Sequence, residues 1–533
     1  CMDTLLMAQQ LQNITVQAPG FAGINSEDSP LTIDQSFASI ASNCVIDQYG
    51  RVGSRKGYET ITTNSTPIDD SRGIEKIHEY VKRDGTKLVF SAGNNQIFTG
   101  TTTLTPVTLP ANYTITANDW KIITFNDDVF FFQRNHAALH YDSSAQSGNP
   151  TLILSEDSSH SAPSAHEAIG AYGKVWAADL SGNKHTVYWS DTLIGNKWHG
   201  GASGSLNLTN VFPTGNDEVV ALAAHNGFLI IFCKRSIIVY SGASSPANMV
   251  LHDTVEGVGC IARDSVQHTG TDILFLSEDG VRSFGRTIQE KSMPMRDISK
   301  NVRTDLVSLI GQQTYSIQSL YSADEAFYLL IFPDSNTVYC FDTRSSLPDG
   351  SLRMTTWSGM GIRTASLLQD KSIYLGNSDG IAEYKGYLDG SSTYIMMYYS
   401  NPLNFGNSTN LKFLKKFKLT VIGNSASSTT LVWGYDYTDS YNKKVFTPSA
   451  DNSSIAEFNI AKFGRKEDID ADNNGVPDEP NYEVFEFTEG TDIQRPVINT
   501  SGSGSVVTIG IESTINGAPY SIQQIDVHAL LGR

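Results

Sequence analysis

The chain has 533 residues, carries a formal net charge of −18 and contains only 18% charged residues. A chain of this length exceeds the size at which a single core stops growing, so two or three domains are expected. Its acidity argues against ordinary nucleic-acid binding, and the absence of any run of about 18 apolar residues argues against a membrane span. The first residues also lack the charged and apolar regions of a secretory signal.

The first expected element is a short helix at residues 34–41, with Asp34 as a possible N-cap and its apolar residues on one face. A strand and a tight turn are expected next, at 43–51. We therefore predict that residues 1–71 form an N-terminal docking segment made of a short helix and strands.

Pairs of apolar runs joined by short polar turns recur over residues 72–390. The clearest copy spans 217–242, where two apolar runs flank a basic turn at Lys234 and Arg235. Further copies begin near residues 79, 120, 271, 326 and 372. Short runs of this kind, bounded by Gly, Asn and Asp, are typical of antiparallel hairpins. Hairpins repeated along a chain predict a β-propeller, whose sheets have only short, protected edges, although unrelated β-meanders are the alternative.

A second short helix is expected at 297–310, with Asp297 as its cap. After Gly390 the apolar runs lengthen, which predicts a C-terminal β-sandwich over 391–533. In the run 411–421, lysines alternate with apolar residues. Such a stripe could contact nucleic acid, but it is more typical of an amphipathic strand with one solvated face. The expected fold is thus mainly β, a β-propeller followed by a β-sandwich.

The five cysteines are widely spaced and form no C-x-x-C pair, which argues against a zinc ribbon or a thioredoxin-like site. Cys233 and Cys340 lie in apolar runs, so we expect them to be buried as small hydrophobic residues. Reduced thiols of this kind fit synthesis in a cytoplasm.

No motif of a zinc protease, a P-loop or a serine hydrolase is present in the sequence. His136 and His140 stand four residues apart, which would suit a metal on a helix, but their surroundings predict strand and turn. Propeller glycosidases need two carboxylates roughly 5 to 9 Å apart, and no motif places such a pair. We therefore expect no catalytic residues and no enzymatic activity.

One acidic segment, 468–479, has the spacing of a metal-binding loop. Counted from Asp470, oxygen donors fall at positions 1, 3, 5 and 9, with glycine at position 6. Position 12 is Asn481, where an EF-hand would place a bidentate glutamate. Two interpretations remain open, a solvated acidic turn and a Ca²⁺ site whose ligands are Asp470, Asp472, Asn474 and Asp478.

Several segments resemble the tail nozzle and packaged-DNA stabilisation proteins of short-tailed bacteriophages. The resemblance is carried by residues 25–30, 43–58, 229–242, 256–260, 278–281, 520–525 and 530–533. It implies a homo-hexameric ring below the portal and adaptor proteins, in contact with tail fibre or tail needle proteins. It also implies a structural protein of the virion tail, made in the host cytoplasm, with no catalytic motif.

Two function classes follow. In the first, the chain is a structural virion protein whose ring continues the DNA exit channel and retains packaged DNA until ejection. The net charge of −18 fits such a channel, because cationic walls would capture the phosphates of sliding DNA. In the second, the chain is a carbohydrate-binding or carbohydrate-active propeller with an appended sandwich, acting as a receptor-binding or glycosidase-like protein.

Overall fold

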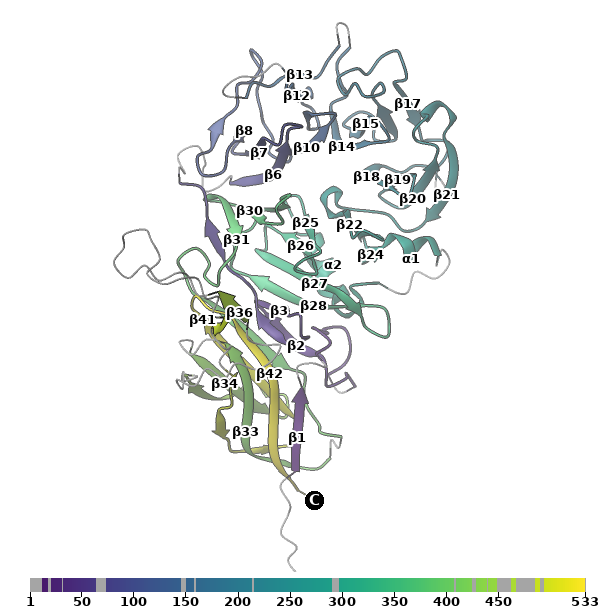
Figure 1. Ribbon diagram of the computed structural model, residues 1–533. Coiled ribbons are helices and arrows are strands. Elements are labelled where there is room, and N and C mark those ends of the chain that lie inside the picture. Colours follow the sequence, from purple (N-terminus) through teal and green to yellow (C-terminus); the bar gives the residue numbers. More distant parts are fainter. Residues whose placement is uncertain are drawn as a thin grey trace, which may run out of the picture. The chain divides into compact units, whose positions relative to one another are not determined.

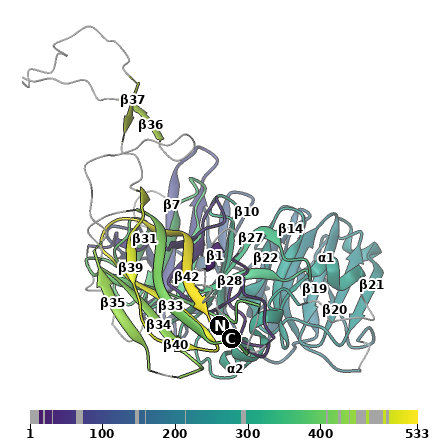
Figure 2. The same ribbon diagram turned by 90° about the horizontal axis from the view of Figure 1, so that it is seen from below.

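The computed structural model describes residues 12–17, 21–30, 32–63, 73–144, 150–157, 160–212, 215–289, 297–406, 409–423, 428–438, 440–447, 462–465, 485–488 and 493–532. The chain divides into two compact units, each assembled from separate stretches of sequence (Figures 1 and 2). The sandwich unit comprises Cys1–Gly23, Ser29–Lys56 and Gly386–Arg533, and the propeller unit comprises Ile24–Asp28 and Gly57–Lys385. No helix of the described residues is long and apolar enough to cross a bilayer.

Antiparallel sheets follow one another along the propeller unit. The first four are β6 (Ile74–Val81), β7 (Lys87–Gly93), β8 (Gln96–Thr99) and β9 (Thr105–Pro106); β10 (Lys121–Phe125), β11 (Asp128–Phe132), β12 (Leu139–Tyr141) and β13 (Ile153–Leu154); β14 (Ala165–Ala171), β15 (Lys174–Leu180), β16 (Thr186–Trp189) and β17 (Gly204–Asn207); and β18 (Val219–His225), β19 (Phe228–Cys233), β20 (Ser236–Ser241) and β21 (Val250–Glu256).

A three-stranded sheet and two further groups of four strands complete the series. They are β22 (Gln267–His268), β23 (Ile273–Ser277) and β24 (Gly280–Ser283); β25 (Gln318–Ser322), β26 (Phe327–Phe332), β27 (Thr337–Ser346) and β28 (Leu352–Ser358); and β29 (Thr364–Leu367), β30 (Ile373–Asn377), β31 (Gly380–Tyr384) and β5 (Tyr58–Thr60). The helices α1 (Phe284–Gln289) and α2 (Arg303–Ile310) lie between β24 and β25 in the sequence.

The first strands of these sheets contact one another in a closed series. β10 contacts β6 and β14, β14 contacts β18, β25 contacts β29, and β29 contacts β6. Between β18 and β25 the series passes through the 3-10 turn η3 (Arg263–Ser265). The ring is completed by β5, an early segment of the chain that pairs antiparallel with β31. These sheets form the predicted β-propeller, with six four-stranded blades and the three-stranded sheet between the fourth and fifth of them (Figure 1).

The turns explain why the hairpins form where the sequence predicts them. Asn226 and Gly227 connect β18 to β19 with φ angles of 49° and 83°, and Asn126 and Asp127 connect β10 to β11 with φ angles of 49° and 70°. Positive φ at both central residues defines the type I′ turn, whose twist matches that of the paired strands. Asn, Asp and Gly adopt this conformation at the least cost.

The sandwich unit contains two antiparallel sheets. One consists of β3 (Cys44–Ile46), β4 (Val52–Ser54), β42 (Tyr520–Leu531), β33 (Lys412–Gly423) and β38 (Ile493–Gln494), with β1 (Gln12–Gln17) on β42 and with β39 (Val497–Asn499) and β40 (Ser503–Gly504) on β33. The other contains β2 (Ala38–Ser42), β32 (Tyr394–Ser400), β41 (Val507–Ile515), β34 (Thr429–Tyr435) and β35 (Asn442–Phe446). The ring of Phe417 on β33 lies 6.3 Å from that of Trp433 on β34, so the inner faces of the two sheets meet. The strands β36 (Lys462–Arg465) and β37 (Phe485–Thr488) pair with each other.

The helix expected at 34–41 is wrong, because residues 34–37 form a turn and 38–41 belong to β2. Asp34 Oδ1 accepts a hydrogen bond from the Ser36 amide at 2.8 Å. This bond to the residue two positions later is an Asx turn, and it takes the place of a helix cap. β2 then pairs with β32 and buries Ala38 and Ala41. Pairing with a strand some 360 residues away in sequence overrides the local pattern.

The second expected helix is confirmed as α2, but Asp297 is not its cap. A 3-10 turn (Lys300–Val302) precedes the helix, and the residue at its N-cap position, Val302, has no capping side chain. Asp297 is buried and pairs with Arg282 at 3.0 Å. The domain boundaries also differ from the expected 1–71, 72–390 and 391–533, because residues of the first segment divide between the two units.

The lysine-rich strand β33 is amphipathic, as predicted for one solvated face. Phe417 and Leu419 are buried, whereas Lys415 is exposed. Lys412 departs from this pattern, because it is buried and its Nζ donates to the Ser505 carbonyl at 2.6 Å. The register shift between Leu414 and Lys416 accounts for the difference, since one extra residue moves the following side chains to the opposite face.

Candidate functional site

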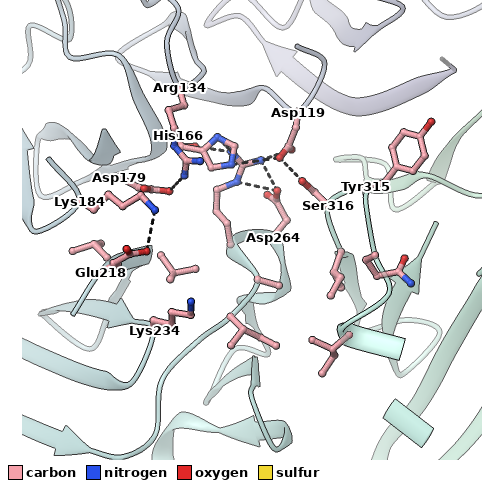
Figure 3. A pocket seen from close by; sticks show the side chains of 18 of the residues that line it. Asp119, Arg134, His166, Asp179, Lys184, Glu218, Lys234, Asp264, Tyr315 and Ser316 are labelled. Atoms are coloured by element: carbon pink, nitrogen blue, oxygen red, sulfur yellow. Dashed lines mark hydrogen bonds and ion pairs between the residues drawn. The ribbon is translucent and has the colours of Figure 1, made fainter. Parts of the chain in front are cut away.

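A cavity of about 410 Å³ opens in the propeller unit where segments leading into the inner strands converge (Figure 3). Asp119 precedes β10, His166 lies on β14, and Glu218 precedes β18. Its charged and polar lining includes Asp119, Arg134, His166, Asp179, Lys184, Glu218, Lys234, Arg263, Asp264, Gln313, Thr314, Tyr315 and Ser316. The propeller topology thus gathers groups that are nearly 200 residues apart in sequence.

Arg263 is the centre of this site. Its Nη2 donates to Asp119 Oδ1 at 2.5 Å and to Asp264 Oδ2 at 2.6 Å. Its Nη1 donates to the His166 carbonyl at 2.6 Å. The side chain of Arg263 is 5% exposed, so burial would disfavour the guanidinium charge if these carboxylates did not surround it. We call Arg263 and its ionic partners the charge hub.

Two lysines extend the charge hub. Lys76 Nζ lies 2.9 Å from Asp264 Oδ1, and Lys121 Nζ lies 3.1 Å from Glu167 Oε2. Burial would raise the pKa of Asp264, but Arg263, Lys76 and Lys121 hold it well below its ordinary value. Glu167 is fully buried, and burial raises the pKa of its carboxyl despite the two nearby cations Lys121 and Arg263.

His166 lies against the hub and is kept neutral. Burial and the Arg263 guanidinium lower the pKa of His166 to about 3, although Asp119 opposes the shift. The ring Nδ1 lies 2.8 Å from Gln133 Oε1, and Nε2 lies 3.5 Å from Asp119 Oδ2. Ser316 donates its hydroxyl proton to Asp119. Asp119 therefore separates the serine from the histidine, and the three groups do not form a nucleophile with an adjacent base.

The rim of the cavity carries further ion pairs. Arg134 pairs with Asp179, and Lys184 Nζ lies 2.9 Å from Glu218 Oε2. Hydrogen bonding from Lys184 lowers the pKa of Glu218. Lys234, in the turn between β19 and β20, forms no direct ion pair with a carboxylate of the described residues, but its charge also lowers the pKa of Glu218. The lining thus contains four cations and four carboxylates, and among these described residues Lys234 is the cation without a direct ion pair.

The residues predicted as a calcium site lie outside the described residues. Asp470, Asp472, Asn474 and Asp478 all fall within 466–484, for which the structure gives no placement. In the part of the chain that is described, no group of three or more His, Cys, Asp or Glu side chains is arranged to hold a metal ion.

His136 and His140 lie in a turn and in β12, as their surroundings predict. His136 Nε2 accepts a hydrogen bond from the Thr116 amide at 3.1 Å, and the His140 ring stacks on Phe130 with centroids 4.6 Å apart. Cys233 and Cys340 are buried, as predicted, and burial raises the pKa of each thiol. These thiols are therefore poor nucleophiles.

The comparisons with known proteins show no family for this chain. No family model matches the chain, and no curated protein matches it. Among solved structures, the WD40 β-propeller domain of Doa1 is 12% identical, with a TM-score of 0.34, over 59% of this chain and 95% of that chain. The AfRom2 CNH domain is 11% identical, with a TM-score of 0.35, over 62% and 99%. The extracellular domain of the B. thetaiotaomicron two-component system BT4673 is 12% identical, with a TM-score of 0.29, over 74% of this chain but only 44% of that chain.

Sequence reasoning did not find the charge hub. Its members are scattered over the chain, and no short motif connects them. One signal was present, because Asp119 and Asp264 of the hub, like Glu218 of the rim, stand within three residues of the start of the first strand of a sheet. A charged residue repeated at that position of successive hairpins predicts a shared site once the hairpins are taken as propeller blades.

Proposed function

We propose that the chain is a structural subunit of a virion tail, six copies of which form a nozzle ring that continues the DNA exit channel. The observation that carries this proposal is the resemblance of its segments to tail nozzle and packaged-DNA stabilisation proteins. The ring would be held by portal and adaptor proteins above it and would retain DNA until ejection, without catalysis.

Residues in the resembling segments have framework roles, which fits a structural protein. Asn25 Oδ1 accepts hydrogen bonds from the amides of Glu27 and Asp28 at 3.0 and 3.1 Å. Glu27 in turn accepts a hydrogen bond from the Thr304 hydroxyl at 2.9 Å, at the first turn of α2. The segment around Glu27 is therefore hydrogen-bonded to the first turn of α2.

Arg55, from the second resembling segment, is fully buried in the sandwich unit. Its two terminal nitrogens each donate to Asp389 at 2.8 Å, and its guanidinium carbon lies 4.0 Å from the ring centroid of Tyr394. A bidentate, stacked arginine is a rigid connection between distant parts of a chain. No substrate or reacting group is required to explain its position.

The charge hub also favours structural support over catalysis. Asp119, Asp264 and Glu218 each lie against a cation that stabilises the ionised form. A general acid at neutral pH needs a raised pKa and access to substrate. Asp179 has a raised pKa through burial, but it accepts a hydrogen bond from Arg134.

The test is electron microscopy of the purified protein and of particles that contain it. We expect closed six-fold rings with a central pore, because copies in a ring meet through one repeated interface. A protein that remains monomeric at high concentration and is absent from particle tails would contradict the proposal.

A second experiment tests the role of acidity. Acidic residues that the reconstruction places at the pore would be replaced by lysine, with the same number of exterior acids replaced as the matched control. Pore lysines should slow DNA ejection at low salt and lose that effect at high salt, because phosphate contacts are salt-dependent. Equal ejection by both sets of variants would count against a sliding channel.

A further inference from the structure

The cavity of the propeller unit offers interleaved donors and acceptors. Lys184, Arg134 and Lys234 can donate hydrogen bonds, and Glu218 and Asp119 can accept them. Sugar hydroxyls both donate and accept, so a polyhydroxylated ligand can bind to such a wall at every position. The volume of about 410 Å³ lies within the range of about 300 to 1,000 Å³ that is typical of small-molecule sites.

The acidic residues of the lining narrow the choice of ligand. Four carboxylates (Asp119, Asp179, Glu218 and Asp264) balance the four cations of the lining, so the cavity has no surplus of positive charge for a polyphosphate or a nucleic-acid backbone. Like charges at close range oppose binding. A fully apolar ligand would bury these ions without replacing their hydration. Of the ligand classes considered, a neutral or singly charged polar ligand therefore fits this cavity.

Lys234 favours a ligand with one negative charge. The other cations of the lining, Arg134, Lys184 and Arg263, each lie against a carboxylate. Lys234 forms no direct ion pair with a described carboxylate, although its charge acts on Glu218, and its side chain is exposed. An ammonium group in this position can bind a ligand carboxylate by a charge-assisted hydrogen bond.

Apolar side chains lie among the charged groups of the lining. Val219 and Val220 follow Glu218 in the chain, and Ile317 also lines the cavity. Tyr315 is partly buried, and the guanidinium carbon of Arg363 lies 4.9 Å from its ring centroid. Figure 3 shows Lys184, Glu218 and Lys234 on one side of the charge hub and Tyr315 and Ser316 on the other. A pyranose ring has an apolar C–H face and a polar edge, so it can contact both the charged and the apolar side chains of this lining.

We propose that this cavity binds an acidic monosaccharide unit of the uronic acid type. Its carboxylate would pair with the Lys234 ammonium group, its hydroxyls would bind Glu218, Lys184 and Asp119, and its apolar ring face would pack toward Tyr315. This proposal does not depend on the ring assembly, since the site lies within one propeller unit.

The test is calorimetric titration of the full chain with glucuronic acid and, in parallel, with glucose. Saturable glucuronate binding is expected, and Lys234→Gln should weaken it about tenfold, a loss of about 1.4 kcal/mol, while leaving glucose binding unchanged. Because Lys234 is exposed, the substitution should leave the melting temperature unchanged, which is checked in the same samples.

The matched control is Arg235→Gln, which removes the neighbouring exposed cation that does not line the cavity. Its glucuronate affinity should equal that of the wild type. Absence of saturable glucuronate binding, equal affinity in Lys234→Gln, or inorganic phosphate binding as tightly as glucuronate would each overturn the proposal.

Discussion

Arg263 is the single cation on which most of the charge hub depends. Replacing it with methionine keeps much of its volume but leaves Asp119 and Asp264 without their main partner. Removing one member of a buried ion pair costs about 3–5 kcal/mol, because the remaining charge stays buried without compensation. Urea unfolding of Arg263→Met should therefore show a loss of this size.

The control for that substitution is Arg303→Met. Arg303 lies 3.1 Å from Asp279, but its side chain is 51% exposed, so water screens the pair. The expected loss is below about 1 kcal/mol. Similar losses for Arg263→Met and Arg303→Met would show that the hub is not the buried network that the structure describes.

His166 gives the stability of the protein a predictable dependence on pH. In the unfolded chain a histidine takes up a proton near pH 6.5, whereas burial and Arg263 hold the pKa of His166 at about 3 in the folded chain. Between these values the unfolded state binds more protons, so stability falls as the pH is lowered from about 6.5 toward 3 and is fully regained above 6.5.

The variant His166→Gln should reduce the loss of stability between pH 6.5 and pH 4, as measured by urea unfolding at several pH values. His252→Gln, which removes an exposed imidazole from β21, is the control and should keep the slope of the wild type. If stability changed equally with pH in the wild type, His166→Gln and His252→Gln, His166 could not be held neutral in the folded protein.

At the scale of elements, β5 is the strand that completes the propeller. Glu59 of β5 stands opposite Glu383 of β31, and the flanking bonds run from the Ile61 amide to the Ile381 carbonyl and from the Lys385 amide to the Gly57 carbonyl. By the alternation of an antiparallel ladder, the Glu59 amide also faces β31. Glu59→Pro removes this donor and should cost about 1–3 kcal/mol.

The matched control is Glu59→Ala, because the Glu59 side chain is 58% exposed and its only described ion pair, with Lys385, spans 3.5 Å at the surface. Thermal melts should show a clear loss for the proline variant and little change for alanine. A proline variant as stable as the alanine variant would mean that β5 does not close the ring in solution.

The acidic segment 468–479 carries a separate prediction. If Asp470, Asp472, Asn474 and Asp478 bind one Ca²⁺ in the native state alone, a hundredfold excess of calcium over Kd stabilises the fold by about 2.7 kcal/mol. Melting curves recorded with calcium and with chelator should differ for the wild type and coincide for Asp470→Ala. Identical curves for both proteins would leave the solvated acidic turn as the interpretation.

At the scale of the whole molecule, each of the two units has its own buried arginine. Arg55 pairs with Asp389 in the sandwich unit, and Arg263 pairs with Asp264 in the propeller unit. We expect scanning calorimetry to resolve two transitions, with Arg55→Met lowering one and Arg263→Met lowering the other. A single transition that both variants lower equally would mean that the units unfold as one.

The sequence determined the local structure of most of the propeller. Asn226 and Gly227 adopt positive φ at their turn, as these residue types readily do, and apolar runs of strand length flank them. These preferences depend on neighbouring residues alone, so the hairpins, α2 and the amphipathic β33 could be predicted. The burial of Cys233 and Cys340 follows from the same local pattern.

Tertiary structure decided everything that depends on distant pairing. β2 is a strand because it pairs with β32. Asp297 does not cap α2, because it is buried and its carboxylate pairs with Arg282. The charge hub has the same origin, since Arg263 and Asp119 are 144 residues apart and meet only when the ring closes. Hydrogen bonds and ion pairs form between groups that are close in space. Which distant residues become close is decided by the complete fold, so short sequence patterns do not predict these partners.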